Sequence, residues 1–448
     1  MAERIAVFGA GYAGLVTGAG FADLGHEVVV RDIAPEKVEA LRAGRVPFHE
    51  PGLEEVIARA GDRLRFTLDP HEAVAGARFV FVCVGTPATY SGDADLSAVW
   101  TVLDDLGQLG EGAVVVMKST VPVGTGDKVR AALDARGLAH VGYVSNPEFL
   151  AEGTAVKDFL EPDRIVIGSF NDADGDAVER LHEGLEAPIV RTDVPSAEMV
   201  KLAANAYLGT RISFINEIAN VCELVGADVE KVAWGMGLDA RIGTRYLQAG
   251  IGFGGSCFPK DISFLKLLAG NSGYHFQLLN SVIEVNELQK RRVVSKLQKH
   301  LGSLRGKTIA LLGLAFKANT DDMREAPSIV LASRLLAEGA DVRAWDPVAD
   351  ASSILRGVTF PGSVLEAVRG ADAAVIVTGW DELRDLPRPE IRDAMRVPLI
   401  VDGRNVVDPD AARANGFTYE GIGRAGTSSL AGLPETDEPA IPERSPDA

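Results

Sequence analysis

Two patterns of apolar residues alternate along the first 150 residues of the chain. Short β-branched runs recur at 5–8, 28–31, 79–84, 114–118 and 141–144, and helical stretches separate them. Continuous apolar runs of this length are typical of parallel strands buried on both faces, and their alternation with helices indicates βαβ units. The N-terminal part therefore predicts a doubly wound α/β sheet.

The pattern changes to one long helical period over residues 194–224. Asp193 can cap this helix, Pro195 suits its first turn and Gly226 can end it. A helix of about 30 residues would be about 45 Å long. A largely helical region continues to about residue 302, after which a strand pattern returns at 308–312.

This second α/β region looks like a degenerate copy of the first. Residues 25–32 read GHEVVVRD and residues 339–346 read GADVRAWD, while FVFVCVGT, ending at Thr86, has a counterpart in AAVIVTGW, ending at Trp380. The pattern predicts two Rossmann-like doubly wound domains joined by a central helical domain with one long helix. We expect domains at 1–193, 194–302 and 303–425, followed by a disordered acidic tail at 426–448.

Composition and charge narrow the class of protein. The chain has 448 residues and a formal net charge of −18, which opposes nucleic-acid or anionic-membrane partners. No apolar run reaches the roughly 18 residues of a membrane span, and no signal peptide is evident. Three cysteines, Cys83, Cys222 and Cys257, are too few for a disulfide framework. We expect a cytoplasmic protein.

A dinucleotide site is predicted directly after the first strand. Gly9, Gly11 and Gly14 form a GxGxxG turn that leads into a helix, whose N-terminus can face a pyrophosphate. Asp32 ends the second strand, where its carboxylate can accept from both ribose hydroxyls and repel a 2′-phosphate. NAD is therefore favoured over NADP, unless Arg31 reaches a 2′-phosphate instead.

The C-terminal copy lacks the triple glycine. Gly313 is separated from Asp346 by 33 residues, against 23 between Gly9 and Asp32, and the extra residues include the polar run KANTDDMREA. Because open α/β sheets bind ligands at the carboxyl ends of their strands, we expect this domain to hold a different nucleotide.

A candidate nucleophile lies in the glycine-rich stretch GFGGSCFPKD, residues 252–261. Cys257 precedes Pro259, which favours a helix start, and Lys260 adds positive charge. Such a setting can lower a thiol pKa from about 8.5 into the range of roughly 3.5–7.5. Asp261 could hold or activate a water. Cys83 and Cys222 are interpreted as small buried hydrophobes.

Four further residues are only weak candidates for a catalytic role when each is judged alone. Lys201 and Asn205 share one face of the long helix, and Glu148 and Glu152 follow a strand in NPEFLAEG; most such residues are merely solvated. Together with Cys257 and a dinucleotide fold, they suggest hydride transfer that passes through a thiol-bound aldehyde.

Residues 4–423 resemble the UDP-glucose/GDP-mannose dehydrogenase family. The resemblance rests on GAGYAGLVTG, VGTP, STVPVGT, NPEFLAEG, GFGGSCFPKD and GLAFKANTDDMREAPS in combination. It implies the four-electron, NAD-dependent oxidation of UDP-glucose to UDP-glucuronate through a cysteine thiohemiacetal and thioester, in a homodimer built on the long helix. It implies no metal site.

The resemblance also implies roles for single residues. Catalytic roles fall on Cys257, Lys201, Asn205, Asp261, Glu152, Thr120 and Glu148. Cofactor contacts fall on Gly9, Gly11, Tyr12, Ala13, Gly14, Asp32, Lys37, Thr86, Thr120, Glu152, Lys260 and Arg324. Substrate contacts fall on Glu148, Phe149, Leu150, Ala151, Glu152, Lys201, Asn205, Tyr246, Leu247, Gln248, Ala249, Gly250, Gly254, Lys317 and Arg404, with Arg241 reaching the substrate of a neighbouring subunit.

Two alternatives stay open at this point. A sister enzyme would act on GDP-mannose or a UDP-N-acetylhexosamine, since base and sugar selectivity lie in loops; Ala151 and Ala13 depart from the family pattern and leave fine substrate preference open. A noncatalytic nucleotide sensor would be expected to lack Cys257, Lys201 or Asp261, and all three are present.

Overall fold

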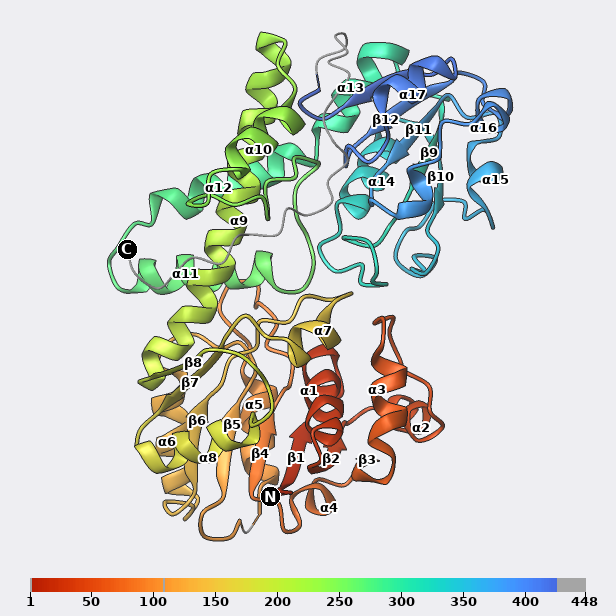
Figure 1. Ribbon diagram of the computed structural model, residues 1–448. Coiled ribbons are helices and arrows are strands. Elements are labelled where there is room, and N and C mark those ends of the chain that lie inside the picture. The colour runs from red at the N-terminus through yellow and green to blue at the C-terminus, as the bar shows by residue number, and fades with distance from the viewer. Residues whose placement is uncertain (1, 108, 425–448) are drawn as a thin grey trace.

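A computed structural model describes residues 2–107 and 109–424 of the chain. Figure 1 shows two α/β bodies, one N-terminal and one C-terminal, linked by a group of helices that includes the long α9. The predicted tail at 426–448 lies outside the described residues. Within the described residues, no helix is long and apolar enough to cross a membrane.

The N-terminal sheet has eight strands in the order β3-β2-β1-β4-β5-β6-β7-β8. Strands β1 to β6 are parallel, β7 runs antiparallel to β6, and β8 is parallel to β7. The strands are β1 (Arg4–Phe8), β2 (Glu27–Arg31), β3 (Leu64–Thr67), β4 (Phe79–Val82), β5 (Val114–Met117), β6 (Gly142–Ser145), β7 (Ile165–Ser169) and β8 (Ile189–Thr192). The helices are α1 (Tyr12–Asp23), α2 (Pro35–Arg42), α3 (Leu53–Ala60), α4 (Pro70–Val74), α5 (Ser97–Asp105), α6 (Thr125–Ala135), α7 (Ala155–Leu160) and α8 (Asp172–Leu181).

Both faces of this sheet are buried, as the apolar runs predicted. Phe79 and Phe81 of β4 join the hydrophobic core on one face, and Val80 and Val82 join the core on the other. Strand β1 lies between β2 and β4, so the chain changes direction across the sheet there. A crevice for a ligand is expected at the carboxyl end of such a strand.

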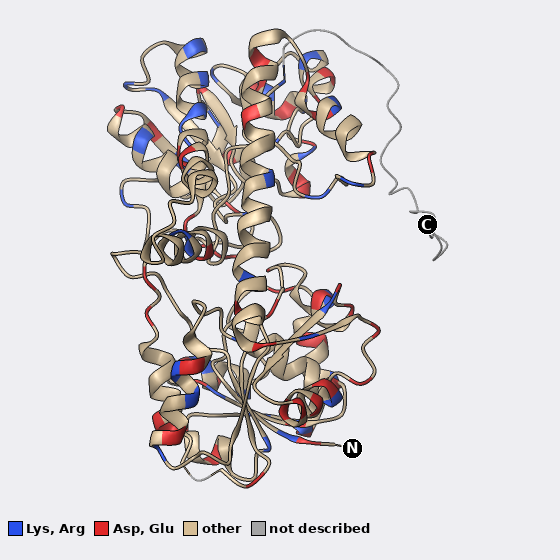
Figure 2. Ribbon diagram, turned by 90° about the vertical axis from the view of Figure 1, so that its left-hand side faces the viewer, with Lys and Arg blue, Asp and Glu red and all other residues tan. Residues whose placement is uncertain are grey.

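The long helix α9 (Val194–Val225) has 32 residues and the predicted ends. The Asp193 carboxylate accepts from the backbone N–H of Ser196 at 2.7 Å, and Gly226 closes the helix in the left-handed conformation. Figure 2 shows α9 running from one α/β body to the other with few charged residues along it. Because Val194, Leu202 and Ile215 belong to three different hydrophobic cores, α9 ties the two bodies together.

The C-terminal sheet is parallel throughout and has the order β10-β9-β11-β12-β13. The strands are β9 (Thr308–Leu312), β10 (Asp341–Trp345), β11 (Ala373–Ile376), β12 (Leu399–Asp402) and β13 (Thr418–Gly421). Helices between and around the sheets are α10 (Val229–Gly237), α11 (Phe258–Asn271), α12 (Gln277–Gln289), α13 (Arg292–Leu301), α14 (Pro327–Ala337), α15 (Val364–Val368), α16 (Pro389–Ala394) and α17 (Pro409–Ala414).

The internal copy found in the sequence occupies equivalent places in the two sheets. Strand β9 is flanked by β10 and β11 as β1 is flanked by β2 and β4. The two matched pairs of sequence strings correspond to β2 with β10 and to β4 with β11. The predicted fold, two Rossmann-like domains joined by a helical region, is therefore confirmed.

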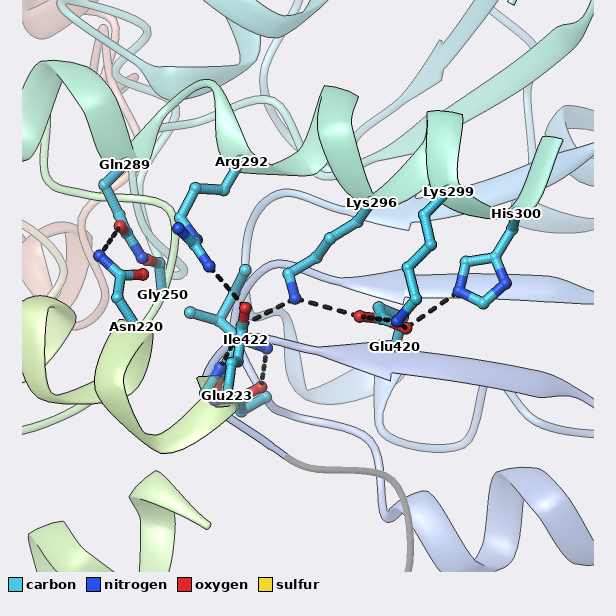
Figure 3. A network of polar contacts seen from close by, with 12 residues as sticks. Asn220, Glu223, Gly250, Gln289, Arg292, Lys296, Lys299, His300, Glu420 and Ile422 are labelled. Carbon is cyan, nitrogen blue, oxygen red and sulfur yellow. Dashed lines mark hydrogen bonds and ion pairs between the residues drawn. The ribbon is translucent and has the colours of Figure 1, made fainter. Parts of the chain in front are cut away.

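A network of ion pairs fixes the far end of α9 to the C-terminal domain (Figure 3). Glu223 on α9 accepts from Arg292 at 2.5 Å and from Lys296 at 2.7 Å, both on α13. Lys296 also lies 3.2 Å from Glu420 on β13, which Lys299 contacts as well. Apart from the exposed Lys299, buried and half-buried charges thus join the far half of α9, helix α13 and the edge strand β13.

Candidate active site

Three elements bring the predicted catalytic residues together. Glu148 and Glu152 lie in the loop after β6, Lys201 and Asn205 lie on α9, and Cys257 begins α11, with Asp261 in its first turn. These elements are distant in sequence, and hydrogen bonds between their side chains join them.

Lys201 and Glu148 form a buried ion pair. Lys201 Nζ lies 2.9 Å from Glu148 Oε1, and Glu148 Oε2 accepts from the backbone N–H of Leu150 at 2.6 Å. Burial alone would lower the pKa of Lys201, but the charge of Glu148 raises it above its ordinary value. Burial likewise opposes ionisation of Glu148, yet Lys201 holds the pKa of that carboxyl below its usual range. The pair therefore presents an ammonium inside the site.

Asn205 and Asp261 form the second pair. Asn205 Nδ2 donates to Asp261 Oδ2 at 2.6 Å, and Lys260 Nζ lies 2.7 Å from Asp261 Oδ1. Asp261 is fully buried. Both carboxylate oxygens are thus held, one by the long helix and one by the neighbouring residue, and Asp261 keeps a fixed orientation near the start of α11.

The expectation of a lowered thiol pKa at Cys257 is wrong for this structure. Burial is the largest influence and raises the pKa, and the nearby charges of Glu148 and Asp261 act in the same direction; the attraction of Lys201 does not overcome them. Cys257 Sγ lies 3.5 Å from Ser256 Oγ. The helix start was correctly predicted, but the depth of burial cannot be read from a local motif.

Glu152 lies where the two α/β domains meet. Its Oε1 accepts from Ser256 Oγ at 3.1 Å and from Arg324 Nη2 at 3.4 Å, and its Oε2 accepts from Thr320 Oγ1 at 3.4 Å. Burial and the neighbouring charge of Asp322 raise the pKa of Glu152 to about 7. A carboxyl with this pKa can gain or lose a proton near neutral pH.

The glycine turn has the geometry that a dinucleotide requires. Gly9 has φ 103°, and a Cβ on Gly14 would lie 1.9 Å from the carbonyl oxygen of Gly9, so both positions need glycine. A Cβ on Gly11 would meet no atom within 4 Å, which leaves open space beside the start of α1. That helix start has no acidic residue in its first turn and no side-chain cap. The residues present therefore fit a bound pyrophosphate.

Asp32 lies beside this turn. Its Oδ2 accepts from the N–H of Ala10 at 2.7 Å and lies 3.4 Å from Lys37 Nζ, and its Oδ1 accepts from the N–H of Ala34 at 3.0 Å. Arg31, the residue that could have favoured NADP, pairs with Asp105 at 3.3 Å.

Other predicted cofactor residues contact protein partners. Tyr12, beside the half-buried Ala13, donates to Asp321 Oδ1 across the domain boundary at 2.8 Å. Thr86 Oγ1 donates to the carbonyl oxygen of Thr120 at 2.6 Å. Arg324 Nη2 lies 2.6 Å from Asp322 Oδ2.

The predicted substrate loop reaches from the helices to the C-terminal domain. Within it, Leu247, Ala249 and Gly250 are buried, Gln248 is exposed, and Tyr246 has a left-handed φ of 62°.

Its neighbours approach the C-terminal domain closely. A Cβ on Gly254 would lie 2.2 Å from the carbonyl oxygen of Glu325. Arg404 donates to the carbonyl oxygens of Val377 at 2.8 Å and Gly252 at 2.9 Å, and burial lowers its pKa to about 10. Lys317 is half-buried, and burial lowers its pKa, although Glu152 and Glu50 act in the opposite direction.

Three further predicted substrate residues, Phe149, Ala151 and Arg241, contact other parts of the protein. The ring centre of Phe149 lies 3.6 Å from the guanidinium of Arg164. The N–H of Ala151 donates to Asp158 Oδ2 at 2.8 Å. Arg241 is 88% exposed and pairs with Asp239 at 2.7 Å.

The sequence reasoning passed over several buried polar residues around the site. Glu50 accepts from the N–H groups of Gly153 at 2.6 Å and Ala155 at 2.8 Å. Lys118 Nζ donates to Asn146 Oδ1 at 3.0 Å, and burial lowers its pKa to about 8. A lysine directly after a fully apolar strand was the available signal for Lys118; Glu50 lies in a polar loop and offers none.

A dinucleotide turn, a second Rossmann-like domain and a cysteine at the start of the helix that carries Asp261 define a nucleotide-dependent oxidoreductase. Three consecutive matches identify it more closely: residues 3–186 match the NAD-binding domain, residues 195–288 the central domain and residues 310–409 the UDP-binding domain of the UDP-glucose/GDP-mannose dehydrogenase family. The chain belongs to this family, and its cofactor is NAD.

Similar proteins span nearly the whole chain. UDP-glucose 6-dehydrogenase YwqF of Bacillus subtilis strain 168 is 47% identical over 430 residues, covering 94% of this chain and 98% of the relative. A UDP-glucose 6-dehydrogenase of Pseudomonas aeruginosa is 46% identical over 446 residues, covering 94% and 97%. The solved UDP-glucose dehydrogenase of Pyrobaculum islandicum superposes with a TM-score of 0.88 at 39% identity, covering 95% of this chain and 98% of the other.

Proposed function

We propose that the chain oxidises UDP-glucose to UDP-glucuronate with two NAD per turnover. The relatives named UDP-glucose 6-dehydrogenase, at 45–47% identity, support this substrate. The observation that carries the reaction type is the position of Cys257 at the start of α11, the helix whose first turn holds Asp261 against Asn205 of α9. The positive charge of Lys201 also acts on this thiol, and such a setting suits covalent capture of an aldehyde.

Bound NAD would accept a hydride in each of the two oxidations. Between them, the Cys257 sulfur bonds to the aldehyde carbon, the thiol proton passes to water, and the carbon–oxygen π bond opens to leave an oxyanion. Lys201 and Asn205 would donate hydrogen bonds to that oxygen, and Glu148 keeps Lys201 charged and fixed. Donors aimed at a developing oxyanion contribute strongly because they act away from bulk water.

The thioester left by the second oxidation is then hydrolysed. Water adds to the carbonyl carbon, the carbon–sulfur bond breaks, and the thiol is regenerated. Asp261 and Thr120 would order this water, and Glu152 would take its proton; a pKa of about 7 suits that transfer at neutral pH.

The binding roles follow the geometry of the two domains. The cofactor would lie against the turn at Gly9–Gly14 with Asp32 and Lys37 at the ribose, and near Thr86, Lys260 and Arg324. The sugar nucleotide would lie along the loop after β6 and along the loop from Tyr246 to Gly254, with Lys317 and Arg404 on the side of the C-terminal domain.

The test is a product assay. The protein is incubated with NAD and UDP-glucose, and NADH is followed by absorbance together with the acid product. Two NADH per UDP-glucuronate supports the proposal, whereas one NADH per substrate indicates simple alcohol oxidation. GDP-mannose and UDP-N-acetylhexosamines are run in parallel, because a solved UDP-D-ManNAc dehydrogenase of Pyrococcus horikoshii superposes with a TM-score of 0.85 at 29% identity. Binding without NADH formation would point to a sensor.

We further propose a homodimer built on α9. Tyr207, Phe214 and Val221 recur every seven residues along that helix and are 61%, 48% and 52% exposed. An apolar stripe on a long helix is typical of a helix–helix interface. Light scattering tests it: the wild type should have twice the monomer mass, and Phe214→Lys should lower it. Arg241 would reach the partner's substrate in such a dimer.

A reducing, cytoplasmic location is proposed from the three free thiols.

A further inference from the structure

Three buried side-chain amides surround the loop that leads from Tyr246 to Cys257. Asn216 lies on α9, while Asn286 and Gln289 lie on α12, and all three are buried. Burying an amide costs free energy unless its polar atoms are hydrogen-bonded. The mechanism uses none of these three residues, so their partners indicate what they do.

Gly250 is held through both of its backbone groups. Its N–H donates to Asn216 Oδ1 at 2.9 Å, and its carbonyl oxygen accepts from Gln289 Nε2 at 2.9 Å. Figure 3 shows Gln289 beside Gly250 and Asn220, and Asn220 Nδ2 lies 3.4 Å from Gln289 Oε1. Helices α9 and α12 therefore both bond to the backbone of Gly250, in the proposed substrate loop.

Phe253 is held in the same way by one side chain. Its N–H donates to Asn286 Oδ1 at 2.8 Å, and its carbonyl oxygen accepts from Asn286 Nδ2 at 3.1 Å. Gly252 lies between Gly250 and Phe253 and has φ 90°. A Cβ on Gly252 would lie 2.6 Å from Asn286 Oδ1. The glycine thus makes room for the amide as well as for the turn.

The opposite side of this loop is bonded to the C-terminal domain. Ile251 N–H donates to the carbonyl oxygen of Gly403 at 3.1 Å, and Gly255 N–H donates to that of Arg324 at 2.9 Å. On its other side, the loop is linked to α9, the helix that carries Lys201 and Asn205, by the bond to Asn216 and by packing of Phe253 with Leu202 of α9. The amide bonds and this apolar contact together set the position of the loop relative to the proposed oxyanion donors.

We propose that Asn216, Asn286 and Gln289 are positioning residues. By bonding to the backbone of Gly250 and Phe253, they hold the sugar-nucleotide loop and Cys257 in a fixed position relative to α9. The inference rests on the proposed function for the identity of the substrate. Gln289 and Asn216 act on Gly250 and hence on substrate binding. Asn286 acts on Phe253, four residues before Cys257, and hence on the chemical step.

The test separates these two effects. Gln289→Met removes the donor to Gly250 at similar volume and should raise KM and Kd for UDP-glucose about tenfold, with KM for NAD unchanged, because the loop is then less ordered before binding and substrate binding must order it. Asn286→Leu should lower kcat by a similar factor. Gln277→Met, at the exposed start of the same helix, is the matched control.

The readouts distinguish the possible failures. A purely structural role predicts a lower unfolding temperature and less active protein, with KM for UDP-glucose unchanged, and that result overturns the proposal. UDP-glucose binding is also measured by calorimetry. A wild type that binds UDP-glucose without oxidising it contradicts the proposed function, while the variants' Kd still decides the role of Gln289. A wild type that neither binds nor oxidises it contradicts both.

Discussion

Lys201 Nζ and Glu148 Oε1 lie 2.9 Å apart in a buried pair that joins the long helix to the loop after β6. The two residues are separated by 53 positions in sequence. Each charge stabilises the other against burial, which keeps an ammonium available where the substrate oxygen is proposed to become negative.

Removing that ammonium should reduce turnover strongly. We expect Lys201→Met to lower kcat by about 10²–10³-fold, the usual loss for one oxyanion donor. Lys201→Met leaves the Glu148 carboxylate buried without its partner, which destabilises the fold. The unfolding of this variant is therefore compared with that of the double variant Lys201→Met with Glu148→Gln. Lys157→Met, on an exposed position of α7, is the control. A kcat near the wild-type value in a folded Lys201→Met protein would contradict the assigned role.

The sulfur of Cys257 should be indispensable for acid formation. Serine keeps the shape of the side chain but is a poorer nucleophile and a poorer leaving group from an ester, so Cys257→Ser should abolish multiple-turnover release of UDP-glucuronate. Product chromatography measures this, with Cys222→Ser as a control at a cysteine outside the site. Release of acid at the parent rate by Cys257→Ser would rule out the covalent route.

Activity should rise with pH through the pKa of Glu152. That pKa is raised to about 7 by burial and by Asp322, so the carboxyl is protonated below pH 7 and can act as a base only above it. We expect kcat for acid formation to increase across this range and the inflection to disappear in Glu152→Gln. Glu161→Gln, at an exposed position, should keep the wild-type profile. An unchanged inflection in Glu152→Gln would assign it to another group.

Asp32 should decide the choice between NAD and NADP. Asp32→Ser removes the carboxylate that would bind the ribose and that also holds Ala10 and Ala34. Hydrogen bonds to a charged group contribute about 1.5–3 kcal/mol, so KM for NAD should rise about 10–100-fold, while KM for NADP should fall because the repulsion is gone. Initial rates with each cofactor measure this, and Asp62→Ser, an exposed change, is the control.

The ion-pair network at Glu420 should stabilise the fold only above acidic pH. Burial opposes ionisation of Glu420, but His300, Lys299 and Lys296 lower its pKa to about 2. An unfolded glutamate has a pKa of about 4.3. The stabilisation is therefore present above about pH 4.3 and is lost as the pH falls toward about 2. Unfolding of the wild type and Glu420→Gln should differ at pH 7 and converge near pH 2; a constant difference would contradict this.

The ends of single elements could be predicted because local chemistry fixes them. Asp193, Pro195 and Gly226 bound α9 as expected, and the start of α11 lies where Pro259 indicated. Strand β9 has the predicted bounds of 308–312. Capping, proline geometry and left-handed glycine act within a few residues, so the sequence displays them directly.

The pKa of Cys257 could not be predicted from its motif. The helix start and Lys260 suggested a lowered value, yet burial and the carboxylates of Glu148 and Asp261 raise it. Glu148 lies more than 100 positions away in sequence. Desolvation and charge–charge distances depend on what packs around a group, and no local pattern contains that information.

The sequence by itself determined the two α/β repeats, the long helix, the glycine turn with Asp32, and the residue types for hydride transfer and covalent capture. These follow from periodicity and from chemistry confined to short segments. Only the tertiary structure decided the pairing of Lys201 with Glu148 and of Asn205 with Asp261. It also decided the place of Glu152 between the domains and the hydrogen bonds from buried amides to the backbone of Gly250 and Phe253. Those relationships depend on distances between segments far apart in the chain, which chain folding alone establishes.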